Sequence, residues 1–211
     1  MPERRRAAAS SWGTNTAANP LKQLLSEQQL REGVRRLADE INVYYQRRPL
    51  VIVGVLTGSV VLLADLIRLL DMPLKVGLVQ ANSYRGAATT PGPLSINLNL
   101  LPQIEGRNVL VVDDIFDTGH TLSGLIEQFT THRPELLRSA VLLRKAGRVQ
   151  VSLQPDHVGF EIPNEFVVGY GLDYGDLYRN LPYVAALEPG EMTAVPDASA
   201  RGANAAEGSA S

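Results

Sequence analysis

The sequence predicts an α/β fold built around a parallel β-sheet. Two short and continuously apolar runs, residues 50–56 and 108–112, are typical of strands that helices bury on both faces. Each run is followed by a turn and then by apolar residues at helical spacing, as in a βαβ unit. Strands and helices that alternate in this way favour an α/β fold with a parallel sheet.

Three helices are predicted. Ser26 and Gln29 form a capping-box pair, after which apolar residues recur at helical spacing until shortly before Pro49. A second helical pattern continues to Leu70, and a third covers residues 122–129.

Further strands complete the predicted sheet. Residues 75–84 form one, and residues 95–100 alternate polar and apolar, as a strand at an edge would. Shorter runs of the same kind are residues 140–143, 166–168 and 183–187. Residues 85–93 are rich in Gly, Ala, Thr and Pro with little to bury, so a mobile loop is predicted there.

The length of the chain, 211 residues, suits one sizeable core. We expect a disordered tail over residues 1–19, one domain over residues 20–188, and a second disordered tail over residues 189–211. The first tail is rich in Arg, Ala and Ser, which leaves a transit peptide as the alternative, although Glu3 and the missing amphipathic period disfavour it.

Composition narrows the classes of function. The formal net charge of -2 provides no general attraction to nucleic acid or to membranes, so an anionic ligand would have to be held by a local site. The absence of cysteine excludes disulfides and thiol nucleophiles, and 3 histidines disfavour a zinc site. No apolar run is long enough to span a bilayer. A cytoplasmic protein that uses hard metal ions is expected.

Acidic and hydroxyl side chains gather where the strand of residues 108–112 ends. Ligands of open parallel sheets bind beyond the carboxyl ends of the strands, which is where Asp113, Asp114 and Asp117 fall. Residues 117–121, which we call the phosphate loop, lead into a helix whose N-terminal N–H groups suit a phosphate. Carboxylates beside such a cradle suit a sugar phosphate with Mg²⁺. The alternative, a helix cap beside solvated aspartates, is disfavoured by the length of the run.

Residues 111–121, VVDDIFDTGHT, resemble the phosphoribosyl-pyrophosphate motif of the type I phosphoribosyltransferases. Within that family, residues 53–59, Ser83-Tyr84, Lys145 and residues 158–174 are similar to the hypoxanthine (6-oxopurine) phosphoribosyltransferases, and the resemblance covers residues 24–187. It implies the type I fold: a central, mostly parallel sheet flanked by helices, a flexible lid loop at residues 85–93, and a small purine-binding hood.

The resemblance also implies an activity in purine salvage. The 5-phosphoribosyl group of phosphoribosyl pyrophosphate would pass to hypoxanthine, and also to guanine, giving IMP or GMP and pyrophosphate, with Mg²⁺ as cofactor. Relatives are homodimers or homotetramers, and the apolar helix of residues 59–70 would serve either an interface or the core.

Roles for single residues on the phosphoribosyl side follow from the same resemblance. Asp113 and Asp114 would hold the ribose hydroxyls, directly or through Mg²⁺, and Asp173 would bind a second Mg²⁺. Arg179 would contact pyrophosphate. The phosphate loop, which would hold the 5′-phosphate, consists of Asp117, Thr118, Gly119, His120 and Thr121. Backbone N–H groups of a turn with a non-proline cis peptide would bind pyrophosphate, and this turn is Leu56, Thr57 and Gly58.

On the purine side, Asp117 would be the general base near N7, or would only orient the purine. Lys145 would contact the exocyclic oxygen, Val167 would offer backbone hydrogen bonds, and the two ring faces would meet Phe166 and Ile115. Taken alone, Lys145 would be a solvated lysine, and Phe166 and Ile115 would be core residues. Ser83 and Tyr84 would begin the lid.

Two positions depart from the family pattern. Thr57 stands where many members have lysine, so only a backbone role is transferred to it. His120 occupies a variable position and is expected to point away from the phosphate. A nucleic-acid-binding regulator is the alternative class, but Arg4 to Arg6 form the only compact basic cluster. Xanthine remains an alternative acceptor.

Overall fold

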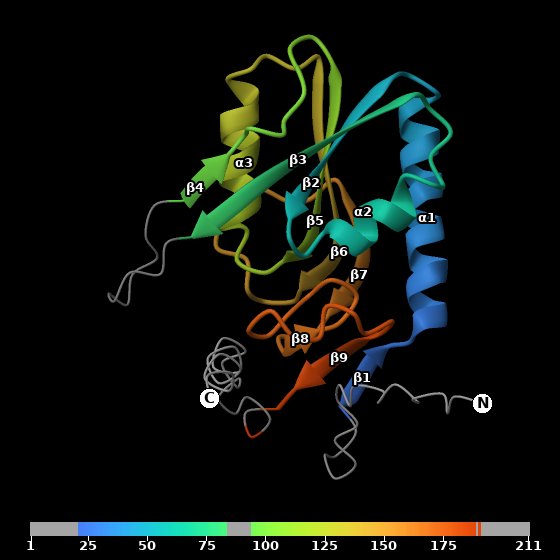
Figure 1. The fold of residues 1–211 in the computed structure, drawn as a ribbon, viewed down its shortest axis with the longest axis vertical. Coiled ribbons are helices and arrows are strands. Elements are labelled where there is room, and N and C mark those ends of the chain that lie inside the picture. The colour runs from blue at the N-terminus through green and yellow to red at the C-terminus, as the bar shows by residue number, and fades with distance from the viewer. Residues whose placement is uncertain (1–20, 84–93, 189, 191–211) are drawn as a thin grey trace, which may run out of the picture.

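The computed structural model describes residues 21–83, 94–188 and Gly190. A larger sheet flanked by helices carries a smaller sheet across one end (Figure 1). In chain order the elements are β1 (Lys22–Leu25), α1 (Glu27–Tyr45), β2 (Leu50–Leu56), α2 (Val60–Leu66), β3 (Leu74–Ser83), β4 (Leu94–Asn97), β5 (Asn108–Phe116), α3 (His120–Thr130), β6 (Leu136–Lys145), β7 (His157–Ile162), β8 (Phe166–Val168) and β9 (Val184–Leu187).

The larger sheet has six strands in the order β4-β3-β2-β5-β6-β7. All neighbours are parallel except β3 and β4, which pair antiparallel at the edge. The predicted α/β class, the mostly parallel sheet and the edge strand are therefore confirmed.

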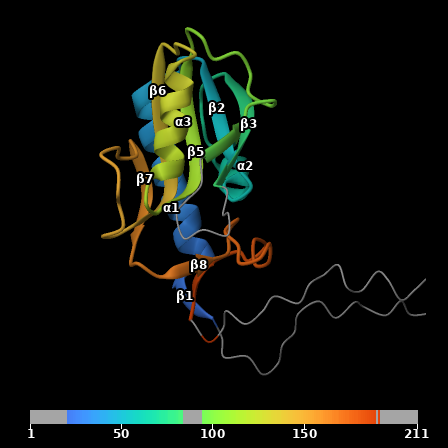
Figure 2. The same cartoon turned by 90° about the vertical axis from the view of Figure 1, so that its left-hand side faces the viewer.

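Both faces of the sheet are covered, as the continuously apolar strands require. On β5, Leu110 and Val112 pack in a core with α1 and α2, whereas Val109 and Val111 pack in a second core with α3. Figure 2 shows α3 and α1 on opposite sides of the sheet. Because β3, β2, β5, β6 and β7 are parallel, their carboxyl ends all lie at the same edge of the sheet.

The predicted capping box at the start of α1 is confirmed. The Ser26 hydroxyl accepts from the Gln29 N–H at 3.2 Å, and the Gln29 side chain accepts from the Ser26 N–H at 2.9 Å. The predicted extension of the second helix to Leu70 is wrong, because α2 ends at Leu66. The Asn42 side chain donates to the Leu69 carbonyl at 3.0 Å and accepts from the Asp71 N–H at 2.9 Å. These two hydrogen bonds hold the chain that follows α2 against α1.

The predicted lengths of two strands are also wrong. β5 continues past residue 112 to Phe116, because Asp113 and Ile115 keep their register with Val141 and Leu143 of β6. The acidic pair therefore lies within the strand and not after it. β6 is likewise longer than residues 140–143, since β5 and β7 pair along its two sides. β1 and β7 were not predicted as strands.

The smaller sheet, β1-β9-β8, forms the predicted hood with the loop after β8. The Tyr170 hydroxyl in this loop donates to Asp65 of α2 at 2.6 Å. A Cβ on Gly171 would overlap the carbonyl oxygen of Gly58, so the hood loop rests directly on the turn after β2. The hood is thereby held against the larger sheet at the carboxyl end of β2.

Several predictions lie outside the described residues: the two disordered tails, and the mobile lid at residues 85–93. Among the described residues, no helix is long and apolar enough to cross a membrane.

Candidate active site

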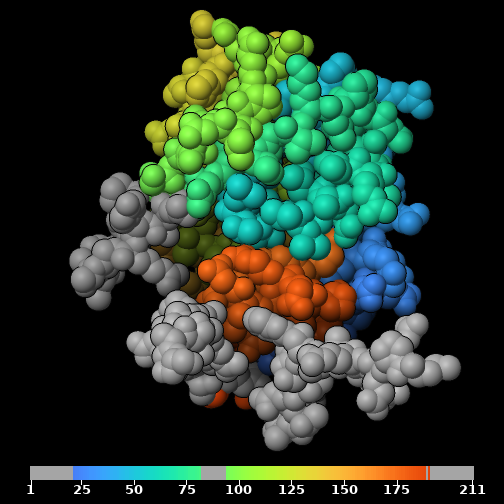
Figure 3. Space-filling model, viewed as in Figure 1, coloured from blue at the N-terminus to red at the C-terminus, as the bar shows by residue number. Residues whose placement is uncertain are grey.

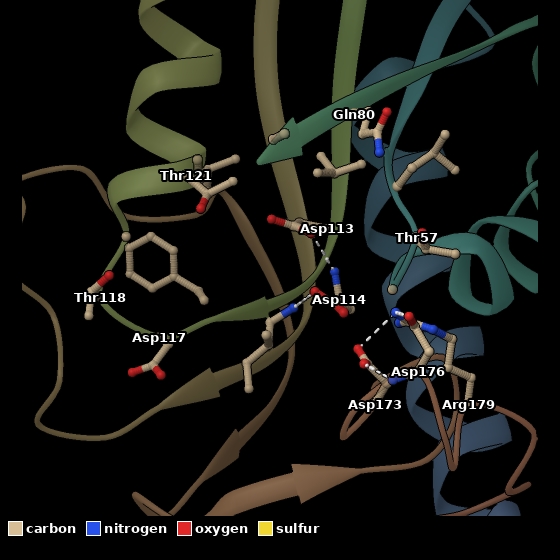
Figure 4. Close-up of a pocket in the computed structure, with 18 residues that line it drawn as sticks. Thr57, Gln80, Asp113, Asp114, Asp117, Thr118, Thr121, Asp173, Asp176 and Arg179 are labelled. Atoms are coloured by element: carbon tan, nitrogen blue, oxygen red, sulfur yellow. Dashed lines mark hydrogen bonds and ion pairs between the residues drawn. The ribbon is translucent and has the colours of Figure 1, made fainter. Parts of the chain in front are cut away.

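A cavity of about 510 Å³ lies at the carboxyl ends of β2, β3 and β5, facing the hood. In Figure 3 the orange part of the hood, which contains the loop after β8, lies directly against the cyan and teal segment that includes α2. Most of the predicted phosphoribosyl-side residues line the cavity: Leu56, Thr57, Gly58, Asp113, Asp114, Asp117, Thr118, Gly119, Thr121, Asp173 and Arg179. Ile115, which was predicted for the purine side, also lines it. Figure 4 shows Asp113 and Asp114 between the phosphate loop on one side and Asp173 and Arg179 of the hood loop on the other.

The acidic pair is held by its own backbone. Asp113 is 7% exposed, and its carboxylate accepts from the Asp114 N–H at 3.0 Å. The Asp114 carboxylate accepts from the Ile115 N–H at 2.7 Å. Burial raises the pKa of Asp113 well above its usual range, and the charge of Asp114 raises it further. Burial likewise raises the pKa of Asp114. Two such carboxyls favour a cation or hydroxyl donors beside them.

The phosphate loop turns sharply into α3. Gly119 has φ +91° and stands at the N-cap of the 11-residue α3. A Cβ there would overlap Val151 and come within 2.8 Å of the Phe116 ring, so only glycine fits. The side chain of His120 hydrogen-bonds Gln150 at 3.1 Å and does not line the cavity, which agrees with the expectation that it points away.

The turn after β2 packs against the acidic pair. The Leu56–Thr57 peptide bond is cis, as the resemblance implied for this turn. A Cβ on Gly58 would overlap an Asp114 carboxylate oxygen and lie 2.5 Å from its carbon. The turn therefore lies against both Asp114 and the hood loop, and Gly58 allows this close approach.

A second cavity of about 200 Å³ adjoins the first and shares Asp114, Ile115, Asp117 and Asp173 with it. Its other lining residues are Lys145, Phe166, Val167 and Leu172. Phe166 is 41% exposed although it is aromatic, and it contacts Tyr174 edge to face with 5.7 Å between ring centroids. All predicted purine-side residues thus meet in one small space.

Asp117 joins the two cavities and is held by two cations. Lys145, the last residue of β6 and 9% exposed, lies with Nζ 3.1 Å from Asp117 Oδ2. Arg148 Nε donates to Oδ1 at 2.9 Å. Burial raises the pKa of Asp117, but the hydrogen bonds from Arg148 and Lys145 outweigh it and lower the pKa overall. The carboxyl is therefore an anion at neutral pH.

At the hood, Asp173 is already engaged. Arg179 lies 2.8 Å from Asp173 Oδ1 and 3.0 Å from Asp176, and it donates to the Gly171 carbonyl at 2.8 Å. The Asp176 N–H donates to Asp173 Oδ2 at 2.8 Å. A cation at Asp173 would thus have to share the carboxylate with Arg179.

Some site residues were missed or cannot be placed. Gln80 lines the larger cavity, and the strand-end rule could have indicated it, since it pairs with Leu56 at the end of β2. Arg148 carries no motif that marks it. Of the predicted lid residues, Ser83 ends β3 and Tyr84 lies outside the described residues.

Comparisons with known proteins agree with this arrangement. The model of the phosphoribosyl transferase domain matches residues 20–175. A hypoxanthine-guanine phosphoribosyltransferase of Staphylococcus aureus is 39% identical over 172 residues, which cover 81% of this chain and 96% of that protein. The solved structure of a hypoxanthine-guanine phosphoribosyltransferase from Bacillus anthracis superposes with a TM-score of 0.75 at 40% identity, covering 80% of this chain and 99% of that one.

A bifunctional protein TilS/HprT of Listeria innocua is 39% identical over 168 residues, and the chain spans only 26% of its length. The fold, the acidic strand end and the matched domain together show that the chain belongs to the phosphoribosyltransferase family. Within that family, the two full-length relatives described above are both hypoxanthine-guanine phosphoribosyltransferases.

Proposed function

We propose that the protein transfers the 5-phosphoribosyl group of phosphoribosyl pyrophosphate to hypoxanthine or guanine, giving IMP or GMP and pyrophosphate in purine salvage. The observation that carries the proposal is Lys145, a 9% exposed lysine paired with Asp117 in a small cavity that adjoins the acidic, phosphate-suited one. The similarity to hypoxanthine-guanine phosphoribosyltransferases supports it. Residues 20–188 would form the catalytic domain.

On the phosphoribosyl side, the phosphate loop would bind the 5′-phosphate through N–H groups at the start of α3 and the hydroxyls of Thr118 and Thr121. Asp113 and Asp114 would accept hydrogen bonds from the ribose hydroxyls. The turn of residues 56–58 and Arg179 would bind pyrophosphate, Arg179 through its fork of donors.

Magnesium fits the donors of this site. Asp113 and Asp114 are hard oxygen donors, and burial raises the pKa of both, so a cation beside them would stabilise their ionised forms. The described residues contain no cluster of three or more potential ligands, so substrate oxygens and water would complete the coordination, as is usual for Mg²⁺. When bound, Mg²⁺ stabilises the negative charge of the pyrophosphate. Asp173 would hold a second ion only by sharing its carboxylate with Arg179.

In the transfer, purine N9 would form a bond to the anomeric carbon while the bond from that carbon to pyrophosphate breaks. Positive charge develops on the ribose ring, and the carboxylates of Asp113 and Asp114 would stabilise it. Asp117 would accept the N7 proton or a hydrogen bond from it. Phe166 and Ile115 would hold the purine ring between them, and backbone groups of Val167 would bind its edge.

We further propose that the protein acts in the cytoplasm as a homodimer or homotetramer. Val60 of α2, close in sequence to the turn of residues 56–58, and Leu177 of the hood loop are 42% and 41% exposed, and such exposed apolar groups suit a subunit contact. Sedimentation of the purified protein would report the state, and a monomer at micromolar concentration would reject this part.

A steady-state comparison of acceptors tests the proposal. Hypoxanthine, guanine, xanthine and adenine are each supplied with phosphoribosyl pyrophosphate and Mg²⁺. We expect turnover with hypoxanthine and guanine, none with adenine, and loss of turnover when EDTA removes Mg²⁺. Absence of turnover with every 6-oxopurine would reject the proposal.

Lys145→Ala is expected to raise KM for hypoxanthine by about tenfold to hundredfold, because a charge-assisted hydrogen bond to the exocyclic oxygen is lost. The ammonium has donors and no acceptor, so it suits an oxo group and not the amino group of adenine. Initial rates at varied hypoxanthine measure the effect. Lys75→Ala, at the opposite end of the sheet, is the matched control, and equal KM values in the two variants would contradict the assignment.

A further inference from the structure

The segment between β6 and β7, residues 147–153, lies across the phosphate loop, and we call it the strap. The Gln150 N–H donates to the Thr118 carbonyl at 2.9 Å, and its side chain hydrogen-bonds His120 at 3.1 Å. Val151 packs against Gly119, in the space where any Cβ at that glycine would lie. Both backbone and side chains therefore tie the strap to the loop proposed to hold the 5′-phosphate.

The strap also places the cationic side chain of Arg148 beside Asp117, which lines both cavities. Arg148 Nε donates to Asp117 Oδ1 at 2.9 Å, while Lys145 Nζ lies 3.1 Å from Oδ2. Each oxygen of the carboxylate is thus held by a different residue, one on the strap and one on β6. Two such contacts restrict the side-chain torsions of Asp117 more than either contact alone would.

The two cations are not equivalent. The Lys145 side chain is 10% exposed and lines the smaller cavity, whereas that of Arg148 is 43% exposed and lines neither cavity. If Lys145 turns its ammonium toward a purine oxygen, its hold on Asp117 weakens, and Arg148 remains to keep the carboxylate in place.

We propose that Arg148 is a positioning residue that, through the strap, couples residues 118–120 of the phosphate loop to the orientation of the Asp117 carboxylate at the purine. This inference rests on the proposed function. It explains how the part of the loop proposed to hold the 5′-phosphate and the carboxylate proposed to face the purine would be kept in place together, since the strap contacts residues 118–120 and the Asp117 side chain. Arg148 touches neither substrate in this account and acts only through Asp117.

The charges around Asp117 set the expected pH effect. Lys145 and Arg148 favour its ionised form and burial disfavours it, and the carboxylates that face the same cavity are Asp114 of β5 and Asp173 of the hood. Removing Arg148 deletes one favourable partner, so the pKa of Asp117 should rise. Because the ionised form is the active one, the acid limb of the pH profile should move to higher pH.

The test uses Arg148→Ala and Arg148→Lys in the full-length protein. For Arg148→Ala we expect kcat/KM for hypoxanthine to fall by about tenfold, the effect of losing one charge-assisted hydrogen bond. The acid limb should shift upward, and KM for phosphoribosyl pyrophosphate should change little, because Gln150 and Val151 still hold the phosphate loop. Arg148→Lys should recover most of the loss. Arg133→Ala removes an arginine paired with Glu105 outside the site and should match the wild type.

A second readout separates this inference from the proposed function. Carbon-13 NMR of labelled aspartate carboxyls, with Asp117→Asn to assign the resonance, measures the titration of Asp117 without turnover. We expect a higher pKa in Arg148→Ala than in the wild type. An unchanged titration would overturn the role of Arg148, even if the wild type makes IMP. Equal losses toward both substrates with an unchanged acid limb would show a merely structural strap. Absence of IMP from the wild type would reject the proposed function, while the titration would still decide the inference.

Discussion

Gly58→Ala is expected to reduce kcat/KM for phosphoribosyl pyrophosphate by at least about hundredfold, because misplacement of reacting groups by about 1 Å can cost that much. A Cβ at this position would overlap the Asp114 carboxylate, so either the turn or the acid must move. The carbonyl of Gly58 also lies against Gly171, which prevents the turn from retreating toward the hood. Initial rates at varied phosphoribosyl pyrophosphate, with circular dichroism to check the fold, measure this effect.

The matched control is Gly190→Ala, because, among the residues that the structure describes, no atom beyond its chain neighbours lies within 4 Å of the added Cβ. That variant should keep the wild-type rate. Activity of Gly58→Ala within about threefold of wild type would mean that the turn does not need its close contact with Asp114, and would contradict the proposed pyrophosphate site.

Asp117→Asn is expected to lower kcat by about hundredfold or more, the usual contribution of a positioned general base, with little change in KM for phosphoribosyl pyrophosphate. The amide keeps the shape of the side chain but can neither take a proton nor balance the charges of Lys145 and Arg148. Steady-state kinetics with both substrates varied separate kcat from the two KM values.

Asp39→Asn, an exposed substitution on α1, controls for the loss of one carboxylate elsewhere. An unchanged kcat in Asp117→Asn would reject the role of general base and leave Asp117 only the orientation of the purine. The lowered pKa of this carboxyl makes it a weak proton acceptor in the free protein. As a general base, Asp117 would take the N7 proton of the purine; in the orienting role it would only accept a hydrogen bond from N7–H.

The sequence predicted those parts of the fold that depend on local patterns. The apolar run of residues 50–56 is the whole of β2, and the capping box places the start of α1. Element ends depend on distant partners and were therefore predicted less well. Asn42 of α1 holds the chain that follows α2, and pairing with β6 continues β5 through the acidic pair. β7 was missed, although its pairing with β6 defines an edge of the sheet.

The same distinction holds for the site. The acidic strand end and the phosphate loop are contiguous in sequence, so position in a parallel sheet was enough to indicate them. The contact of Arg148 with Asp117 joins residues 31 apart in sequence, and Tyr170 with Asp65 joins residues 105 apart. Such contacts arise only when the strap and the hood fold over the sheet, and no local pattern predicts them. The purine side depended on resemblance to known phosphoribosyltransferases.

The most direct test of the proposed function is the stoichiometry of its products. Purified protein is mixed with hypoxanthine, phosphoribosyl pyrophosphate and Mg²⁺, and IMP and pyrophosphate are quantified over time. The account predicts that both appear in equal amounts and that no free ribose 5-phosphate accumulates. Release of pyrophosphate without IMP, or no reaction with hypoxanthine or guanine, would contradict it.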